Sequence, residues 1–179
     1  MNITFSWAFL MRSFHTIGYE GATLDDFIAA LIGANVATLV DVREVAISRK
    51  KGFSKRGLAA ALASAGLAYA HLPRLGDPKS GRLAARAGDL AEFRAIYEAH
   101  LSAPAAQESF QALAGPIRSG GACLMCFERD PAFCHRTILA RRLETEFHFR
   151  KVDLYVETSF RSRGQGARTH ARQGLAAAE

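Results

Sequence analysis

The sequence GACLMCFERDPAFCHRTILARRL, residues 121–143, decides the predicted fold of this chain. Its apolar start, residues 122–127, is typical of a strand buried on both faces, and residues 128–130 predict a short polar loop. A helix is expected to begin through Asp130 and Pro131, because aspartate is a favoured N-cap and proline fits the first helical position. The stretch therefore predicts a strand, a loop and a helix, with Cys, Glu, His and Arg side chains gathered where the strand ends.

The rest of the chain alternates the same two patterns. Further strands are expected over residues 13–18, 37–42, 67–72 and 149–156. Helices are expected over residues 23–33, 58–65, 89–102 and 104–118, and the segment 73–82, with its prolines and glycines, is expected to be a loop. Strands that alternate with helices pair mainly in parallel, through right-handed crossovers. The predicted fold class is α/β: a three-layer domain with a mainly parallel sheet of about five strands.

One domain is expected, because 179 residues suffice for a single hydrophobic core. We assign it to residues 13–156, with an N-terminal extension at 1–12 and a flexible, basic C-terminal tail at 157–179. The apolar start of the extension is too short to span a bilayer, so no membrane association is expected. Three cysteines, an odd number, argue against a disulfide framework and predict reduced thiols in a cytoplasmic protein.

The net charge of +6 and the pI near 9.6 suggest an anionic partner. The candidates are nucleic acid and a phosphorylated small molecule, and the alternative is a basic surface that serves only solubility. Two loops concentrate positive charge: residues 49–56, which include Ser54 and Lys55, and the segment that begins near Arg74. Lysine and arginine beside an aromatic residue suit a phosphate backbone, although solvated side chains give the same pattern.

The cysteines occupy both faces of the predicted strand. Cys123 and Cys126 lie three residues apart in an extended segment, so their side chains point to opposite faces and cannot easily share a metal ion. Cys123 is expected in the core, where free cysteine packs as a small hydrophobic residue. Cys126 and Glu128 share one face at the strand exit, and Cys134 returns toward it through the first turn of the helix.

Cys134 and His135 each keep alternatives open. The helix dipole and nearby arginines are expected to lower the pKa of Cys134 and stabilise a thiolate, and the alternative is a cysteine that packs in the core. His135 has three interpretations: an acid–base group, a metal ligand together with Cys126 and Cys134, or a hydrogen-bonded structural residue.

Arginine side chains supply the predicted anion-binding groups. Arg136 is expected to bind phosphate or carboxylate through its guanidinium, and the alternative is an ion pair with Glu128 or Asp130. Asp41 and Arg43 lie on one face at the end of the neighbouring strand. They either contribute to the same sheet edge, where ligands bind in open α/β sheets, or form a salt bridge with each other.

These residues, in this order, resemble the DUF488 family, a group of small bacterial and archaeal α/β proteins without an established biochemical role. The likeness runs over residues 13–156. It rests on HTIGY at 15–19, LVDVR at 39–43, FS at 53–54, Tyr69 with Leu75-Gly76, and C-x-E-x2-P-x2-C-H-R from Cys126 to Arg136. The last motif is the specific one. This chain departs from the family at Tyr19 and Glu20, where histidine and serine are commoner, and at Asp77, where glycine is commoner.

Three functional hypotheses are compatible with these residues. The first is an enzyme that binds or processes a nucleotide, a nucleic acid or another phosphorylated anion, with Cys126, Glu128, Cys134 and His135 as the catalytic groups. Its expected anion-binding residues are Arg136, Arg43, Asp41, Tyr19, Ser54, Lys55 and Arg74. The second is a nucleic-acid-binding accessory module without catalysis. The third is a metal or redox site built from Cys126, Cys134 and His135. The sequence predicts neither a particular cofactor nor an oligomeric state.

Overall fold

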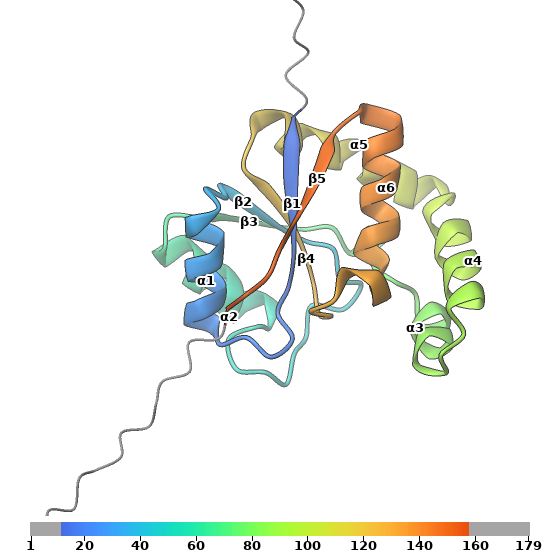
Figure 1. The fold of residues 1–179 in the computed structure, drawn as a ribbon, viewed down its shortest axis with the longest axis horizontal. Coiled ribbons are helices and arrows are strands. Elements are labelled where there is room, and N and C mark those ends of the chain that lie inside the picture. Colours follow the sequence, from blue (N-terminus) through green and yellow to red (C-terminus); the bar gives the residue numbers. More distant parts are fainter. Residues whose placement is uncertain (1–11, 158–179) are drawn as a thin grey trace, which may run out of the picture.

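Five parallel strands form one sheet at the centre of the computed structural model, which describes residues 12–157 (Figure 1). The strands are β1 (Ser13–Gly18), β2 (Thr38–Asp41), β3 (Ala68–His71), β4 (Ala122–Cys126) and β5 (Arg150–Leu154). Their order across the sheet is β3-β2-β4-β1-β5, and every pair is parallel. β4 therefore lies between β2 and β1, and its carboxyl end lies at the middle of the sheet edge.

Six α-helices of the described chain cover the two faces of this sheet. They are α1 (Leu24–Gly33), α2 (Lys55–Ser64), α3 (Lys79–Arg86), α4 (Leu90–Leu101), α5 (Pro104–Ser119) and α6 (His135–Phe147). Figure 1 shows α1 and α2 on one side of the sheet, with α4, α5 and α6 on the other. The domain thus has the three α/β layers that the alternation of patterns predicts.

Alternate strand residues fill two separate cores. Phe14 packs with the apolar side chains of α4, α5 and α6 in one core, whereas Ile17 packs with those of α1 and α2 in the other. This alternation follows from the two-residue period of an extended strand. Cys123 belongs to the α1 and α2 side, and Cys126 faces α6, so the predicted placement of these cysteines on opposite faces is confirmed.

The prediction of a loop at residues 73–82 is wrong. A short 3₁₀ helix occupies Pro73–Leu75, and α3 begins at Lys79. Pro78 is the N-cap of α3, where its missing N–H costs no helical hydrogen bond. Gly81 lies within the helix. The position requires glycine because a Cβ would come within 2.1 Å of Oδ1 of Asp77. The prolines and glycines that indicated a loop instead mark a helix boundary and a close contact.

The helix that the sequence places at Asp130 and Pro131 begins later. Pro131–Phe133 form a 3₁₀ helix, which Asp130 caps by accepting a hydrogen bond from the N–H of Ala132 at 2.8 Å. α6 starts after Cys134, which is its N-cap, and no side chain caps this helix by a hydrogen bond. Cys134 therefore lies at the entrance of α6 rather than within its first turn.

The predicted N-terminal extension and C-terminal tail lie, except for Arg12 and Glu157, outside the described residues. Within residues 12–157, none of the helices has the length and apolar character needed to cross a membrane.

Candidate functional site

Cys126, Cys134 and His135 form a buried cluster at the carboxyl end of β4, which we call the Cys–His cluster. Cys126 ends the strand, and the chain returns through the 3₁₀ helix so that Cys134 and His135 lie at the start of α6. Their exposed fractions are 5%, 2% and 5%, respectively. One donor atom from each residue lies within 4.8 Å of the other two. The structure thus brings together three residues that the sequence predicts to be neighbours.

The imidazole of His135 faces both sulfur atoms. Its Nδ1 lies 3.6 Å from Sγ of Cys126 and 3.9 Å from Sγ of Cys134. Its Nε2 lies 2.9 Å from the carbonyl oxygen of Val42, which can only accept a hydrogen bond. In the neutral ring Nε2 therefore carries the proton, and Nδ1 presents its lone pair to the thiols. On the other side of Cys126, Oε2 of Glu128 accepts a hydrogen bond from the thiol at 3.3 Å.

Burial is the largest single influence on the pKa values of Cys134 and His135. It raises the pKa of the Cys134 thiol, and the neighbouring Cys126 raises it further. For His135, burial lowers the pKa, but Cys134 and the hydrogen bond to Val42 outweigh it, so the pKa is raised overall. The predicted lowering of the Cys134 pKa is therefore wrong, because desolvation of the buried thiolate exceeds the stabilising effect of the helix end.

A cavity of about 230 Å³ lies beside the Cys–His cluster, and we call it the α3 cavity. Glu128 reaches it from the loop after β4 and His135 from the start of α6. Arg82 and Arg86 reach it from α3. The remaining wall consists of Asp77, Ala85, Phe93 and Phe133. Imidazole, carboxyl and guanidinium groups line the cavity, and the two thiols lie next to its His135, 3.6 and 3.9 Å from Nδ1. These are the groups that acid–base and nucleophilic catalysis use.

Asp77 lines this cavity although no pattern in the sequence predicts it as a site residue. It is 8% exposed, and its Oδ1 has no hydrogen-bond partner among the described residues. Burial raises its pKa to about 6, although His135 and Arg82 act to lower it. A carboxyl group with such a pKa exchanges protons readily near neutral pH. The one signal in the sequence was that Asp77 replaces a glycine that is commoner in the family.

Arg136 holds the loop after β4 rather than presenting its guanidinium to a ligand. The side chain is 1% exposed. Nη1 and Nη2 donate to the backbone carbonyls of Glu128 and Arg129, and Nε donates to the hydroxyl of Thr16 at 3.3 Å. Gly18 lies against the same loop so closely that a Cβ would be 1.8 Å from the Glu128 oxygen. The predicted role of Arg136 in anion binding is therefore not supported, because all three nitrogens already bond to the protein.

Asp41 and Arg43 form a closed network on the opposite face of the sheet, beside the core of α1 and α2. Arg43 donates to both carboxylate oxygens of Asp41, at 2.8 and 2.6 Å, and to the hydroxyl oxygen of Tyr19 at 2.9 Å. Tyr69 donates to Asp41 at 2.7 Å, and Tyr19 stacks on Phe53 in the α1 and α2 core. The salt-bridge interpretation is confirmed. Anion binding by Asp41, Arg43 and Tyr19 is not supported, because these groups satisfy one another and the sheet separates them from the Cys–His cluster.

Ser54, Lys55 and Arg74 make local contacts. Ser54 exchanges hydrogen bonds with the backbone of Ser48. Lys55 is exposed at the start of α2, and Arg74 is exposed with its carbonyl 2.9 Å from Nε2 of His100. Within residues 12–157 none of these three residues contacts the Cys–His cluster through a hydrogen bond or an ion pair, so the structure does not join the two basic loops to it.

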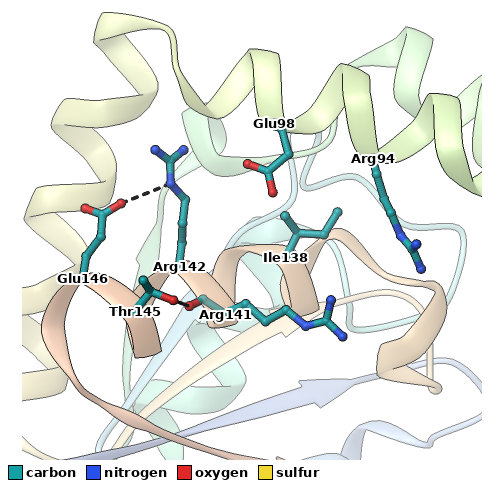
Figure 2. Close-up of a pocket in the computed structure, with 7 residues that line it drawn as sticks. All are labelled: Arg94, Glu98, Ile138, Arg141, Arg142, Thr145 and Glu146. Atoms are coloured by element: carbon teal, nitrogen blue, oxygen red, sulfur yellow. Dashed lines mark hydrogen bonds and ion pairs between the residues drawn. The ribbon is translucent and has the colours of Figure 1, made fainter.

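A second cavity, of about 370 Å³, lies between α4 and α6. Figure 2 shows Arg142 paired with Glu146, while Arg94 extends from α4 and Arg141 from α6. Its other lining residues are Glu98, Ile138 and Thr145. The described residues of this wall include neither cysteine nor histidine, so the second cavity lacks the thiol and imidazole groups that nucleophilic chemistry uses.

The fold and the site define a class of protein: a three-layer α/β domain with a buried cysteine–histidine site at the carboxyl end of its central strand. The family model "Domain of unknown function DUF488" matches residues 23–143. This range covers β2, β3, β4 and the whole Cys–His cluster. The chain therefore belongs to the DUF488 family. Comparisons with curated proteins and with solved structures gave no match.

Proposed function

We propose that the protein is an enzyme that binds and processes a nucleotide or another phosphorylated anion in the α3 cavity. The observation that carries the proposal is the lining of that cavity. Arg82 and Arg86 line it together with Glu128 and with His135, which also belongs to the Cys–His cluster. Guanidinium groups pair with phosphate oxygens, and the cluster supplies the reactive groups.

The size of the cavity narrows the substrate. Pockets for drug-sized ligands usually measure about 300–1,000 Å³, and the α3 cavity measures about 230 Å³. Such a space suits the phosphorylated end of a small molecule or a single nucleotide better than a segment of duplex. A mononucleotide with its phosphate toward α3 is therefore the preferred substrate class.

The two arginines differ in availability. Arg82 bonds to the carboxylate of Glu44 and to the backbone carbonyl of Asp77, so it is already partly neutralised. Arg86 is exposed in the last turn of α3 and makes no hydrogen bond or ion pair with the described residues. Arg86 is accordingly the expected first contact of the phosphate, with Arg82 behind it.

The alternative, a nucleic-acid-binding module without catalysis, depends on the basic loop at residues 49–56. Arg49, Lys51 and Lys55 are exposed there, which is compatible with phosphate contacts but equally with solvation. It predicts binding to oligonucleotides that weakens steeply with salt and with charge reversal in this loop. A cytoplasmic location stays a prediction that goes with the three free cysteines.

The test is equilibrium binding and turnover with a panel of nucleotides, phosphorylated sugars and short oligonucleotides, using the full chain. Arg86→Ala should weaken binding of the preferred phosphorylated ligand by about tenfold, as loss of one charge-assisted hydrogen bond implies. Arg94→Ala removes an exposed arginine outside the α3 cavity and should leave affinity unchanged. Cys126→Ser should abolish turnover while the affinity persists. Equal affinities of the Arg86→Ala and Arg94→Ala variants, or binding only of oligonucleotides through residues 49–56, would contradict the proposal.

A further inference from the structure

We infer that the Cys–His cluster is a zinc site, with Cys126, Cys134 and His135 as its three protein ligands. Two thiolates and an imidazole are a donor set that zinc prefers. The inference names the ion that would act on a ligand in the α3 cavity. The catalytic role of this ion rests on the proposed function, whereas the binding of the ion does not.

The two distances from His135 Nδ1 to the sulfur atoms match a tetrahedral zinc site, and all three donor atoms lie within 4.8 Å of one another. With Zn–S near 2.3 Å and Zn–N near 2.0 Å, ligand sulfur and nitrogen atoms lie about 3.5 Å apart. In this chain His135 Nδ1 lies 3.6 and 3.9 Å from the two sulfur atoms. Both separations come within a few tenths of an ångström of the expected value, so an ion fits between the three atoms with only small side-chain adjustments.

The orientation of His135 is the second, independent observation. A metal-binding histidine usually donates its other ring N–H to a carbonyl or carboxylate, which fixes both the ring and the tautomer. Nε2 of His135 makes this hydrogen bond to the carbonyl of Val42 at 2.9 Å, and it leaves Nδ1 directed at the sulfur atoms. The backbone of the neighbouring strand thus prepares the imidazole for coordination.

The surrounding charge also fits a divalent cation. Two thiolates balance a Zn²⁺ ion, so the loaded cluster is neutral apart from Glu128, in a place where an unbalanced charge is costly. The arginine closest in sequence, Arg136, turns its guanidinium to the backbone of Glu128 and Arg129 rather than to the sulfur atoms. It therefore holds the loop that carries Glu128 in place without occupying the cluster.

His135 is the one ligand of the three that lines the α3 cavity, so we place the open fourth position of the ion on the side of this cavity. Glu128 lies 3.3 Å from Sγ of Cys126 and, like His135, lines the cavity. Three protein ligands with one open position are the pattern of catalytic rather than structural zinc sites. When bound, the ion would lower the pKa of a water in that position, and the Glu128 carboxylate would be the group that accepts the proton. Zinc deaminases use the same division of roles, with two cysteines and a histidine as ligands and a glutamate as the acid–base group.

The test measures metal content before any activity. The full chain is purified under reducing conditions, loaded with zinc chloride, desalted and analysed by mass spectrometry of the elements. One zinc per chain is expected for the wild type and close to none for Cys126→Ser, Cys134→Ser and His135→Gln. The matched control is Cys123→Ala, which removes the cysteine on the opposite face of β4 and should retain the ion. Zinc retained in the Cys134→Ser variant would overturn the inference.

A second measurement covers the case in which a ligand variant fails to fold. Cobalt(II) added to the wild-type chain should give thiolate-to-metal charge-transfer absorption and the intense visible bands of tetrahedral coordination, and zinc should displace both. A wild-type protein that binds neither metal overturns the inference even if it binds nucleotides, in which case the proposed function stands. A chain that binds zinc but no phosphorylated ligand retains the zinc site and loses the proposed function.

Discussion

At the scale of single residues, the site depends on positions where one atom more would not fit. The carbonyl of Glu128 approaches Gly18 so closely that a side chain of any size collides with it. Gly76, directly after the 3₁₀ helix Pro73–Leu75, approaches Glu44 in the same way, with a Cβ only 1.9 Å from its nitrogen. These contacts hold the loops that carry Glu128 and Asp77, so substitutions at the two glycines act on the site through the backbone.

The Gly18→Ala substitution should lower the free energy of unfolding by about 2 kcal/mol or more. The added Cβ would lie 1.8 Å from the Glu128 oxygen, and backbone atoms cannot move aside as a flexible side chain can. Urea unfolding followed by circular dichroism measures the change. Gly33→Ala is the control, because no atom lies within 4 Å of its Cβ and helical glycine to alanine stabilises by about 0.5–1 kcal/mol. Equal stabilities of the two variants would show that the loop adjusts without cost.

Asp77 should make the metal-free protein less stable as the pH rises. Its pKa is about 6 in the folded chain and about 3.9 in an unfolded one. The unfolded carboxyl therefore loses its proton first, and stability falls between about pH 4 and pH 6 and then levels off. The loss of unfolding free energy is on the order of 1–2 kcal/mol, because solvent in the cavity screens part of the charge on the carboxylate. Asp77→Asn, which cannot ionise, should flatten this part of the profile in urea titrations at pH 4 to 7. An unchanged slope would assign the titration to another group.

At the scale of elements, α6 is joined to β1 by polar rather than apolar contacts at its first turn. Arg136 donates to Thr16, and Thr16 donates to Asp153 of β5 at 2.6 Å. Lys151 in turn pairs with Asp153 at 2.7 Å. This chain of groups connects the start of α6, β1 and β5, and it explains why a fully buried arginine is tolerated: each of its three nitrogens donates to an acceptor.

Replacement of Arg136 by alanine should cost about 3 kcal/mol or more in unfolding free energy. The change leaves the carbonyls of Glu128 and Arg129 without their donors and opens a void in the first turn of α6. Arg141→Ala, on the exposed side of the same helix, should stay within about 0.5 kcal/mol of the wild type. Thermal and urea unfolding of both variants give the comparison. A small effect at Arg136 would mean that the loop after β4 is held by its other contacts.

The sequence predicted the strands and helices better than it predicted which distant side chains meet in the site. Apolar period and turn residues located all five strands within two residues at each end, because buried parallel strands have a strong local pattern. The sequence did not predict α3 because proline and glycine usually indicate a loop. Here Pro78 is the N-cap of the helix, and Gly81 leaves room for the Asp77 side chain, which the local sequence pattern does not reveal. The Cys–His cluster was predicted because its members lie within ten residues of chain. Asp77 and α3 reach the same cavity from some fifty residues earlier, a distance over which spacing carries no information.

At the scale of the whole molecule, the sheet divides the polar residues that the sequence placed together. The Cys–His cluster and the α3 cavity lie on the side of α4, α5 and α6, and the Asp41–Arg43 network lies on the side of α1 and α2. Residues that follow the ends of adjacent strands share an edge, but the two-residue period sends them to different faces. The two polar groups should therefore respond separately to mutation.

Arg43→Lys tests this separation. Lysine cannot reproduce the two parallel hydrogen bonds to Asp41 or the bond to Tyr19, so the free energy of unfolding should fall by about 1–3 kcal/mol. The zinc content and the affinity for the phosphorylated ligand should remain within about twofold of the wild type, a difference of less than 0.5 kcal/mol. The three measurements are made on the same preparation. A parallel loss of stability and of ligand affinity would show that the network supports the site across the sheet.

The position of β4 in the strand order has a consequence for how the protein folds. β1 and β2 are not neighbours; both pair with β4, and His15 of β1 lies opposite Cys123, 108 residues later in the chain. Pairing over such separations is slow, because the chain loses conformational entropy before the contacts between the paired strands can compensate for it. During synthesis the gap between β1 and β2 must stay open until β4 has been made. The Cys126 thiol at its end is consequently among the last parts of the molecule to be enclosed, and until then it is exposed to oxidants and to any metal ion in the compartment.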